Sequence, residues 1–245
     1  MKKTILIYKI RTAIRKKATL LFLFNISFSQ WAGYDISQVE YSSSDLRTFI
    51  ESTAFGLSAN PFLMLSPEKR VYVGATISKN ALVRSNTYQH QLSGLVPKFS
   101  ADVFITNNLY FIGGLSQFYT DDDIVHSHNY GIALTSGEDA FYPWQASVVF
   151  FRLTGPKVLT LRTVSLNLST VTQVMNYQIQ AGLGKEMYSA TFFLNDVNFP
   201  TGMKGEINYL LLGIELEKGS FGIVPQIRVH PGLIGVSVGM TLGID

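Results

Sequence analysis

The fold is decided by the last strand-like stretch of the chain, Ile234-Gly235-Val236-Ser237-Val238-Gly239-Met240-Thr241-Leu242-Gly243-Ile244. Large apolar residues occupy one parity of this stretch, and glycine, serine and threonine occupy the other. Successive side chains of a β-strand point to opposite faces, so one face meets hydrocarbon and the other meets small or polar groups. The hydrocarbon is either a protein core or a lipid bilayer.

Segments with the same alternation recur from about residue 54 onward, among them Val71 to Ser78 and Phe99 to Thr106. A weaker one covers Ala54 to Leu65, and a return strand begins at Leu109. Further strands are expected to begin near Tyr130, Trp144, Val158, Val171, Tyr188, Ile207, Phe221 and Leu233. The pattern predicts an all-β chain of about 12 strands, within a range of about 10 to 14.

Short turn sequences separate these segments, which favours an antiparallel up-and-down meander. The expected turns are Asn107-Asn108, Gly155-Pro156, Gly184-Lys185-Glu186, Lys218-Gly219 and Pro231-Gly232. Between Lys157 and Ser169 the apolar parity changes. Three interpretations stay open there: a bulge near Arg162 and Thr163, two short strands, or one strand buried on both faces.

The first 29 residues have the layout of a secretory signal peptide. Met1 to Lys17 carries seven basic residues and no acid, Ala18 to Ile26 is apolar, and Ser27-Phe28-Ser29 offers small residues at a cleavage site. An amphipathic helix or an uncleaved anchor is the alternative. Cleavage leaves residues 30–245 as a single domain, in which Asp45 to Glu51 could form a short helix or the region could add a strand.

Charge in the predicted mature part excludes the usual nucleic-acid binder. Of 20 basic residues, seven precede Gln30, so 13 basic residues remain against 17 acidic ones, a net charge of −4. The basic surplus that phosphate backbones require is therefore missing.

A membrane barrel explains the composition better than a soluble sheet does. Charged residues make up only 15% of the chain, against roughly 25% in soluble domains. No apolar run after Gln30 is long enough for a helical span, whereas several segments have the length of a membrane-crossing strand. We therefore predict a transmembrane β-barrel of the outer membrane, in contact with outer-membrane lipid.

Polar residues opposite the apolar faces are then expected to line the lumen. The lumen-facing candidates are Lys98, Asp102, Gln178, Gln180, Glu215, Gln226 and Arg228. In a pore Arg228 would set the charge preference, and in a filled lumen it would pair with Glu215.

Long connections near residues 79–97, 120–129 and 196–204 do not fall on one side of a barrel of 12 strands. Outer-membrane barrels place their longer loops on one side, so either a strand has been miscounted or the loops are weakly asymmetric.

Chemistry is sparse in this chain. There is no cysteine, no Gly-X-Ser-X-Gly, no His-Glu-X-X-His and no phosphate-binding glycine loop. A weak metal candidate combines Asp121 and Asp123 with His126 and His128, although such acidic loops are usually solvated. No catalytic residue and no cofactor is predicted; a membrane-barrel lipid hydrolase would need serine and histidine, with His230 or His90 as the base, to converge at one rim.

The final third resembles the PorP/SprF type of outer-membrane protein. The resemblance rests on Tyr177 to Leu183, Phe192 to Pro200, Tyr209 to Leu216, Val224-Pro225 and the leader ending Phe28-Ser29-Gln30. The Asn-Pro-Ala-rich opening of that family is not present, and Asn60-Pro61 is the nearest trace. The resemblance implies a non-enzymatic component of type IX secretion and gliding, with secretion-machinery proteins as partners.

The function expected from the sequence is thus a non-enzymatic secretion component or a small pore. The first alternative is a secreted soluble β-barrel that binds an apolar ligand, which predicts strands of about six residues and a charged exterior.

Overall fold

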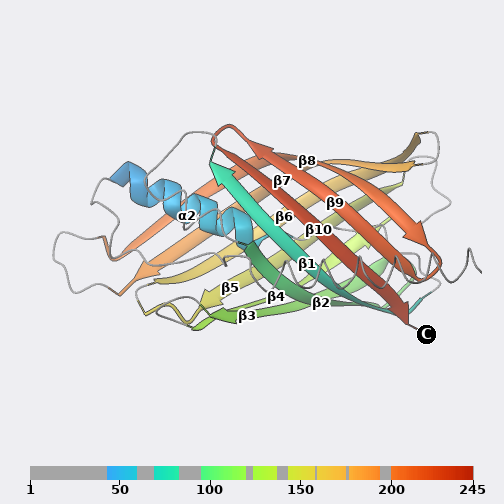
Figure 1. Ribbon diagram of the computed structural model, residues 1–245, viewed down its shortest axis with the longest axis horizontal. Helices are drawn as coiled ribbons and strands as arrows, with labels where there is room; N and C mark the ends of the chain where they lie inside the picture. Colours follow the sequence, from blue (N-terminus) through green and yellow to red (C-terminus); the bar gives the residue numbers. More distant parts are fainter. Residues whose placement is uncertain are drawn as a thin grey trace, which may run out of the picture. The chain divides into compact units, whose positions relative to one another are not determined.

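The computed structural model describes residues 43–59, 69–82, 95–119, 124–136, 143–157, 159–174, 177–193 and 200–244. It contains ten strands that close into one barrel (Figure 1). The strands are β1 (Val71–Leu82), β2 (Leu95–Phe104), β3 (Leu109–Tyr119), β4 (Ile124–Thr135), β5 (Trp144–Thr154), β6 (Leu159–Val174), β7 (Tyr177–Phe192), β8 (Gly202–Lys218), β9 (Phe221–His230) and β10 (Leu233–Ile244).

Each strand pairs antiparallel with its neighbour in sequence, and β10 closes the barrel onto β1. The predicted antiparallel up-and-down barrel is confirmed, at the lower limit of the predicted strand number. Among the described residues, no helix combines the length and apolar character that a membrane-crossing helix requires. The predicted signal peptide, residues 1–29, lies outside the described residues.

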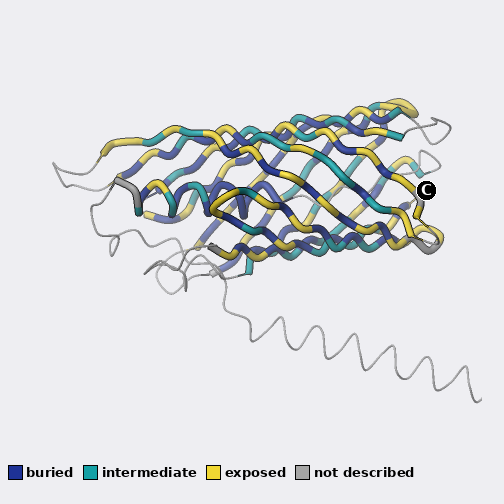
Figure 2. The backbone as a smooth tube through the Cα atoms, turned by 90° about the horizontal axis from the view of Figure 1, so that it is seen from above, coloured by how far each residue is buried: buried dark blue, intermediate teal, exposed yellow. Residues whose placement is uncertain are grey.

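Buried and more exposed residues alternate along most strands of the barrel wall (Figure 2). In β4 the alternation is unbroken, and the exposed positions include Tyr130, Ile132 and Leu134. In β10 the apolar residues Val236, Leu242 and Ile244 point outward while Gly235 and Ser237 are buried inside. An exterior this apolar, on strands of 10 to 17 residues, matches a lipid-facing surface and not a charged soluble one.

The structure has ten strands, within the predicted range of 10 to 14 but fewer than the central value of 12, partly because three predicted segments form two long strands. The segments expected at Val171 and Tyr188 lie inside β6 and β7. The turn expected at Gly184-Lys185-Glu186 is paired throughout with β6 and β8. The weak strand expected from Ala54 was also wrong, since Ala54 to Leu57 is helical. The turns at Gly155-Pro156, Lys218-Gly219 and Pro231-Gly232 are confirmed, and Gly155 and Gly219 have positive φ.

The corrected count places the two longest connections at the same end of the barrel. The strand ends joined by residues 83–94, 120–123, 155–158, 193–201 and 231–232 form one end, which we call the loop rim. The strand ends joined by residues 105–108, 136–143, 175–176 and 219–220 form the other end, which we call the turn rim. The three connections expected to be long all leave strands at the loop rim, but 120–123 has only four residues and the turn-rim connection 136–143 has eight, so the loop asymmetry typical of outer-membrane barrels is weak.

The change of parity in β6 is not a bulge. The register of β6 with β5 and β7 runs without interruption through Arg162 and Thr163. Leu159 and Leu161 are buried inside the barrel, whereas Leu166 and Leu168 are exposed outside. The apolar residues change face because the interior near the loop rim is itself apolar.

That interior is filled by one helix, α2 (Ser43–Leu57). Its first turn contains Asp45, and an acid at this position stabilises the positive end of the helix dipole. The expected short helix at Asp45 to Glu51 is therefore real but longer. Figure 1 shows α2 at the loop-rim end of the barrel.

Candidate functional site

The second half of α2 is buried on all sides. From Phe49 to Ala59 every residue except Glu51 is buried, which is the pattern of a helix enclosed by protein. Its apolar residues form one core with inward-facing residues of the wall: Leu46, Phe49, Ile50, Ala54, Phe55 and Leu57 from the helix, and Val96, Phe118, Val125, Leu153, Leu159, Leu161, Tyr188, Ala190, Phe192, Ile207, Tyr209, Leu211 and Leu233 from the strands.

The helix runs along β1 from the loop rim toward the middle of the barrel. Asn80 donates to the carbonyl of Ser52 at 2.7 Å, and Ser78, one inward position deeper, donates to the carbonyl of Gly56 at 3.3 Å. At the entrance Arg47 pairs with Glu51 at 2.9 Å, and the Tyr188 hydroxyl donates to Glu51 at 3.1 Å. The glycine-rich face of β10 receives the helix, because the ring of Phe55 lies 3.0 Å from where a Cβ on Gly235 would be.

Two cations of the wall neutralise the C-terminal end of α2. The last turn of the helix carries no basic residue of its own, and its free carbonyls form the negative end of the helix dipole. Arg228 Nη2 donates to the carbonyl of Phe55, and Lys98 Nζ donates to the carbonyl of Ala59 at 2.5 Å. The barrel thus supplies the capping charges that the helix sequence lacks.

Arg228 is the centre of this contact. Its guanidinium pairs with Glu186 at 2.9 Å, donates to the Ser58 hydroxyl at 3.1 Å, and lies over the rings of Phe55 and Tyr209 at 4.2 and 5.3 Å. Ser58 in turn donates to Glu186. Arg228 is 2% exposed and Glu186 is fully buried, so this ion pair links β7, β9 and the end of α2 in a water-poor environment.

Between the end of α2 and the turn rim, the barrel interior contains a polar layer followed by a second apolar layer. Gln226 donates to Gln180 at 3.0 Å, and Gln180 donates to Ser169 at 3.3 Å. The two glutamines meet over Gly213 of the intervening strand. Nearer the turn rim a second apolar cluster lies inside the barrel, formed by Tyr72, Phe104, Tyr110, Ile112, Ala133, Val149, Phe151 and Val224. Side chains therefore fill the described interior in three layers.

The structure places the seven predicted lumen-facing residues on the inward parity of their strands. Lys98, Gln180, Glu215, Gln226 and Arg228 are buried there, and Asp102 is partly exposed. Gln178 is exposed at the turn-rim end of β7.

The partner expected for Arg228 was wrong. The register places Arg228 opposite Leu211, two inward positions away from Glu215, and its ion partner is Glu186. Glu186 was not among the candidates because the local composition predicts a turn, and Ser58 was not because it fell within the weak strand expected from Ala54 to Leu65.

The histidine candidates do not converge. His126 and His128 are exposed on the outward face of β4, whereas Asp121, Asp123 and His90 lie outside the described residues. His230 Nδ1 lies 2.7 Å from the carbonyl oxygen of Asn208. In the part of the chain that the structure describes, no three acidic or histidine side chains are grouped closely enough to hold a metal ion.

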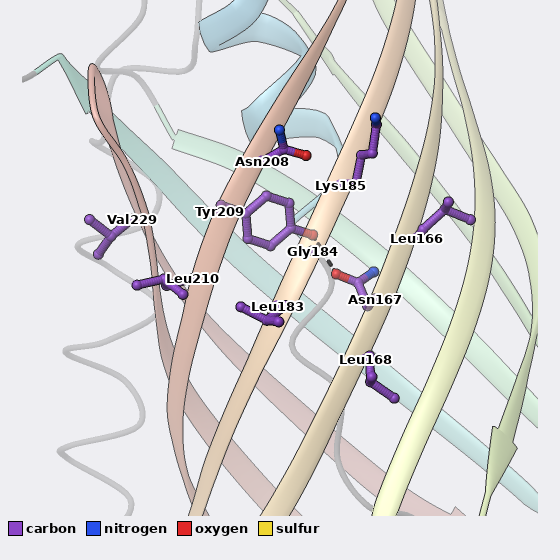
Figure 3. Close-up of a pocket in the computed structure, with 10 residues that line it drawn as sticks. All are labelled: Leu166, Asn167, Leu168, Leu183, Gly184, Lys185, Asn208, Tyr209, Leu210 and Val229. Carbon is purple, nitrogen blue, oxygen red and sulfur yellow. Dashed lines mark hydrogen bonds between the residues drawn. The ribbon is translucent and has the colours of Figure 1, made fainter.

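The outer wall carries a groove of about 510 Å³ over β6 to β9 (Figure 3). Its sides are the outward-facing leucines 166, 168, 183 and 210 with Val229, and Lys185 and Asn208 border it. On the inner side of the wall the ring of Tyr209 packs against Gly184 and fills the space that a Cβ would need. The Tyr209 hydroxyl donates to Asn167, which also borders the groove.

A closed up-and-down barrel with an apolar outer surface, its two longest connections at one rim and a polar interior layer defines the class of outer-membrane β-barrel proteins. No protein-family model and no curated protein matches the chain.

Solved outer-membrane barrels match this chain with low TM-scores and low sequence identity. The translocator domain of the autotransporter NalP from Neisseria meningitidis has a TM-score of 0.40 and 9% identity, over 82% of this chain and 96% of that one. The transport unit of the autotransporter AIDA-I from Escherichia coli has a TM-score of 0.38 and 12% identity, over 80% and 97%. For a loop-deletion mutant of OmpT, an outer membrane protein of Vibrio cholerae, the values are 0.36 and 9%, over 60% of this chain and 53% of that one. Scores of this size carry no functional argument, so the class assignment rests on the barrel itself.

Proposed function

We propose that the protein is a closed outer-membrane barrel that serves as a non-catalytic component of a secretion machinery of the type IX kind, with proteins of that machinery as partners. The observation that carries the proposal is the filled interior: α2 occupies the loop-rim half, and the cluster around Tyr110 and Phe104 occupies the turn-rim half. A conducting pore needs a continuous polar path, and these two apolar layers interrupt it. The resemblance of the final third to PorP/SprF proteins supports the secretion role.

Absence of catalysis is part of the proposal. A membrane-barrel hydrolase needs a base beside a nucleophile. Of the histidines that the structure describes, His126 and His128 face outward from β4, and Nδ1 of His230 lies within hydrogen-bond distance of a backbone carbonyl. These positions favour a structural role for the barrel.

Conductance in planar bilayers tests whether the barrel is closed. The full-length protein is expected to insert without steady current. Replacing both cations that hold the helix end, Arg228→Met with Lys98→Met, is expected to give intermittent openings, because the carbonyls of Phe55 and Ala59 lose their donors. Lys79→Met serves as the control, since Lys79 is exposed on the outer face of β1. Steady current from the unmodified protein would establish the small-pore alternative instead.

Gene deletion in the source bacterium tests the secretion role. The deletion strain is expected to retain exported cargo inside the cell envelope, and full-length protein is expected to restore export. Normal export after deletion, together with no cross-links to other envelope proteins, would overturn the proposal.

A further inference from the structure

Three basic side chains lie side by side on the outer wall near the loop rim. The register pairs His128 of β4 with Arg152 of β5, and Arg152 with Arg162 of β6. All three are exposed on the outward face. Within the described residues, neither arginine forms an ion pair, whereas Lys185 on the adjacent β7 pairs with Glu206 at 2.7 Å.

Two arginines directly opposite each other are unfavourable without an anion between them. Like charges at opposed positions of an antiparallel pair repel, because their Cβ atoms are only about 5 Å apart. Each guanidinium also carries a fork of parallel N–H donors, which is the geometry that binds two oxygens of a phosphate. The row therefore has the charge and donor arrangement for one shared phosphate.

The surroundings place this row at the depth of lipid headgroups. Directly below it, toward the turn rim, Tyr130 stacks on Phe150 with ring centroids 5.4 Å apart, and the two rings are 61% and 41% exposed. On β4 to β6 the next outward row is aliphatic and contains Ile132, Val148 and Leu166, and on β7 the same row continues to Lys185 at the border of the groove. The order from cation to aromatic to aliphatic residue matches the order from phosphate through interface to hydrocarbon in one leaflet.

The groove lies at the right distance to receive an acyl chain. From Arg162 the outward positions of β6 run through Val164 and Leu166 to Leu168, which lines the groove. Six residues span about 20 Å along a strand, or about 15 Å along the membrane normal at a tilt of about 40°. That is about half of the ~30 Å hydrocarbon thickness, and therefore the depth of one leaflet.

We propose that the outer wall holds a specific site for a phosphate-bearing membrane lipid, with Arg152 and Arg162 on the phosphate, His128 beside it, and an acyl chain in the groove between Leu168, Leu183 and Leu210. The site lies on the opposite side of the wall from α2, so it does not depend on whether the lumen conducts or on a secretion role.

Native mass spectrometry of the full-length protein in neutral detergent tests the site. The probes are phosphatidylglycerol and lipid A, with phosphatidylcholine as the zwitterionic comparison. Arg152→Gln and Arg162→Gln are each expected to weaken anionic-lipid binding about fivefold, and the double variant about 30-fold, the factors that correspond to about 1 kcal/mol per arginine. Phosphatidylcholine binding should not change.

Lys79→Gln is the matched control, because Lys79 is an outward-facing cation whose cross-strand neighbours are the apolar Val236 and Leu95. It is expected to leave all three lipids unaffected. The heat-dependent gel shift verifies folding of each variant. Equal binding of anionic lipid by the double variant and the unmodified protein would overturn the proposal, and so would an equal loss in the double variant and in Lys79→Gln.

A fluorophore in the groove tests the acyl-chain part separately. Leu168→Trp, in a background where Trp31 and Trp144 are phenylalanine, should be quenched by chain-brominated phosphatidylglycerol at lower mole fraction than by chain-brominated phosphatidylcholine. Adding the double arginine substitution should remove that difference. Equal quenching by both lipids before the substitution would show that the groove holds only bulk lipid.

Discussion

The same residue type has opposite environments on the two sides of the barrel wall. Arg228 points inward, where a carboxylate, a hydroxyl and a helix carbonyl accept its donors. Arg152 and Arg162 point outward, where each faces another cation across the strand pair. A buried charge has to be paired within the protein, because nothing else is available to it. An exposed charge at the membrane surface can take its partner from the bilayer.

Substitutions of inward-facing and outward-facing arginines are therefore expected to change different properties: protein stability inside the barrel and lipid binding outside it. Inside the barrel the arginine holds the end of α2, so its substitution is expected to affect folding. Outside the barrel the arginines hold no described part of the chain, so their substitution is expected to affect lipid contact. The largest expected effects are therefore those of substitutions in the interior.

Glu186→Gln is expected to lower the free energy of unfolding by about 3 kcal/mol, because it leaves the buried Arg228 cation without its counter-ion. Urea titration in detergent micelles, followed by the heat-dependent gel shift, measures the change. Lys185→Gln is the matched control: Lys185 is the preceding residue, points outward and forms an exposed pair with Glu206, so its loss should cost at most about 1 kcal/mol.

A double-mutant cycle measures the coupling energy between Glu186 and Arg228. Combining Glu186→Gln with Arg228→Met removes both charges, and the double variant should be more stable than the sum of the single effects predicts. Equal costs for Glu186→Gln and Lys185→Gln would contradict the distinction between the inner and outer faces.

Gly235→Val is expected to cost about 1 to 3 kcal/mol by overpacking the contact between β10 and the helix. The new side chain would meet the Phe55 ring, which already lies 3.0 Å from the Cβ position. Gly232→Val, three residues away in the turn, meets nothing within 4 Å and should change stability by no more than about 0.5 kcal/mol. Urea titration of both variants under the same conditions measures the difference, and a larger cost at Gly232 would show that Gly235 does not receive the helix.

Much of the wall could be predicted from the sequence because its pattern is local. Ile234 to Ile244 alternates without interruption, and the structure places its apolar residues outside. The turns at Gly219 and Pro231 could also be predicted, since glycine and proline favour turns largely independently of their surroundings. The lumen candidates followed from parity once the strands were placed.

The strand boundaries in β6 and β7 were mispredicted where a residue contacts a partner far away in the sequence. Gly184-Lys185-Glu186 has the composition of a turn, yet Gly184 makes room for Tyr209 and Glu186 pairs with Arg228, 25 and 42 residues farther along the chain. The parity change in β6 has a similar cause, because Leu159 and Leu161 face the core around α2. Local periodicity cannot report contacts made across the lumen.

The helix itself was hard to predict because it is enclosed. A surface helix shows a polar and an apolar face, but Phe49 to Ala59 has no solvent-facing side to mark. The pairing of the two outer arginines could not be predicted from the sequence either. Arg152 and Arg162 are ten residues apart in sequence, and only the register of β5 with β6 brings them together.

Arg152→Gln is expected to have the smallest effect and to change sign with the surrounding lipid. In neutral detergent without anions, removing one of two opposed cations should raise the free energy of unfolding by about 0.2 to 1 kcal/mol. Raising the salt concentration toward about 1 M should stabilise the unmodified protein more than the variant, because the Debye length then falls to about 3 Å, shorter than the separation of about 5 Å between the opposed side chains. In bicelles that contain phosphatidylglycerol the unmodified protein should become the more stable of the two, since lipid that binds only the folded state stabilises it. Urea titration in the two media measures both signs. A loss of stability in neutral detergent would mean that Arg152 already has a partner within the chain, and the contrast with Arg228 would then disappear.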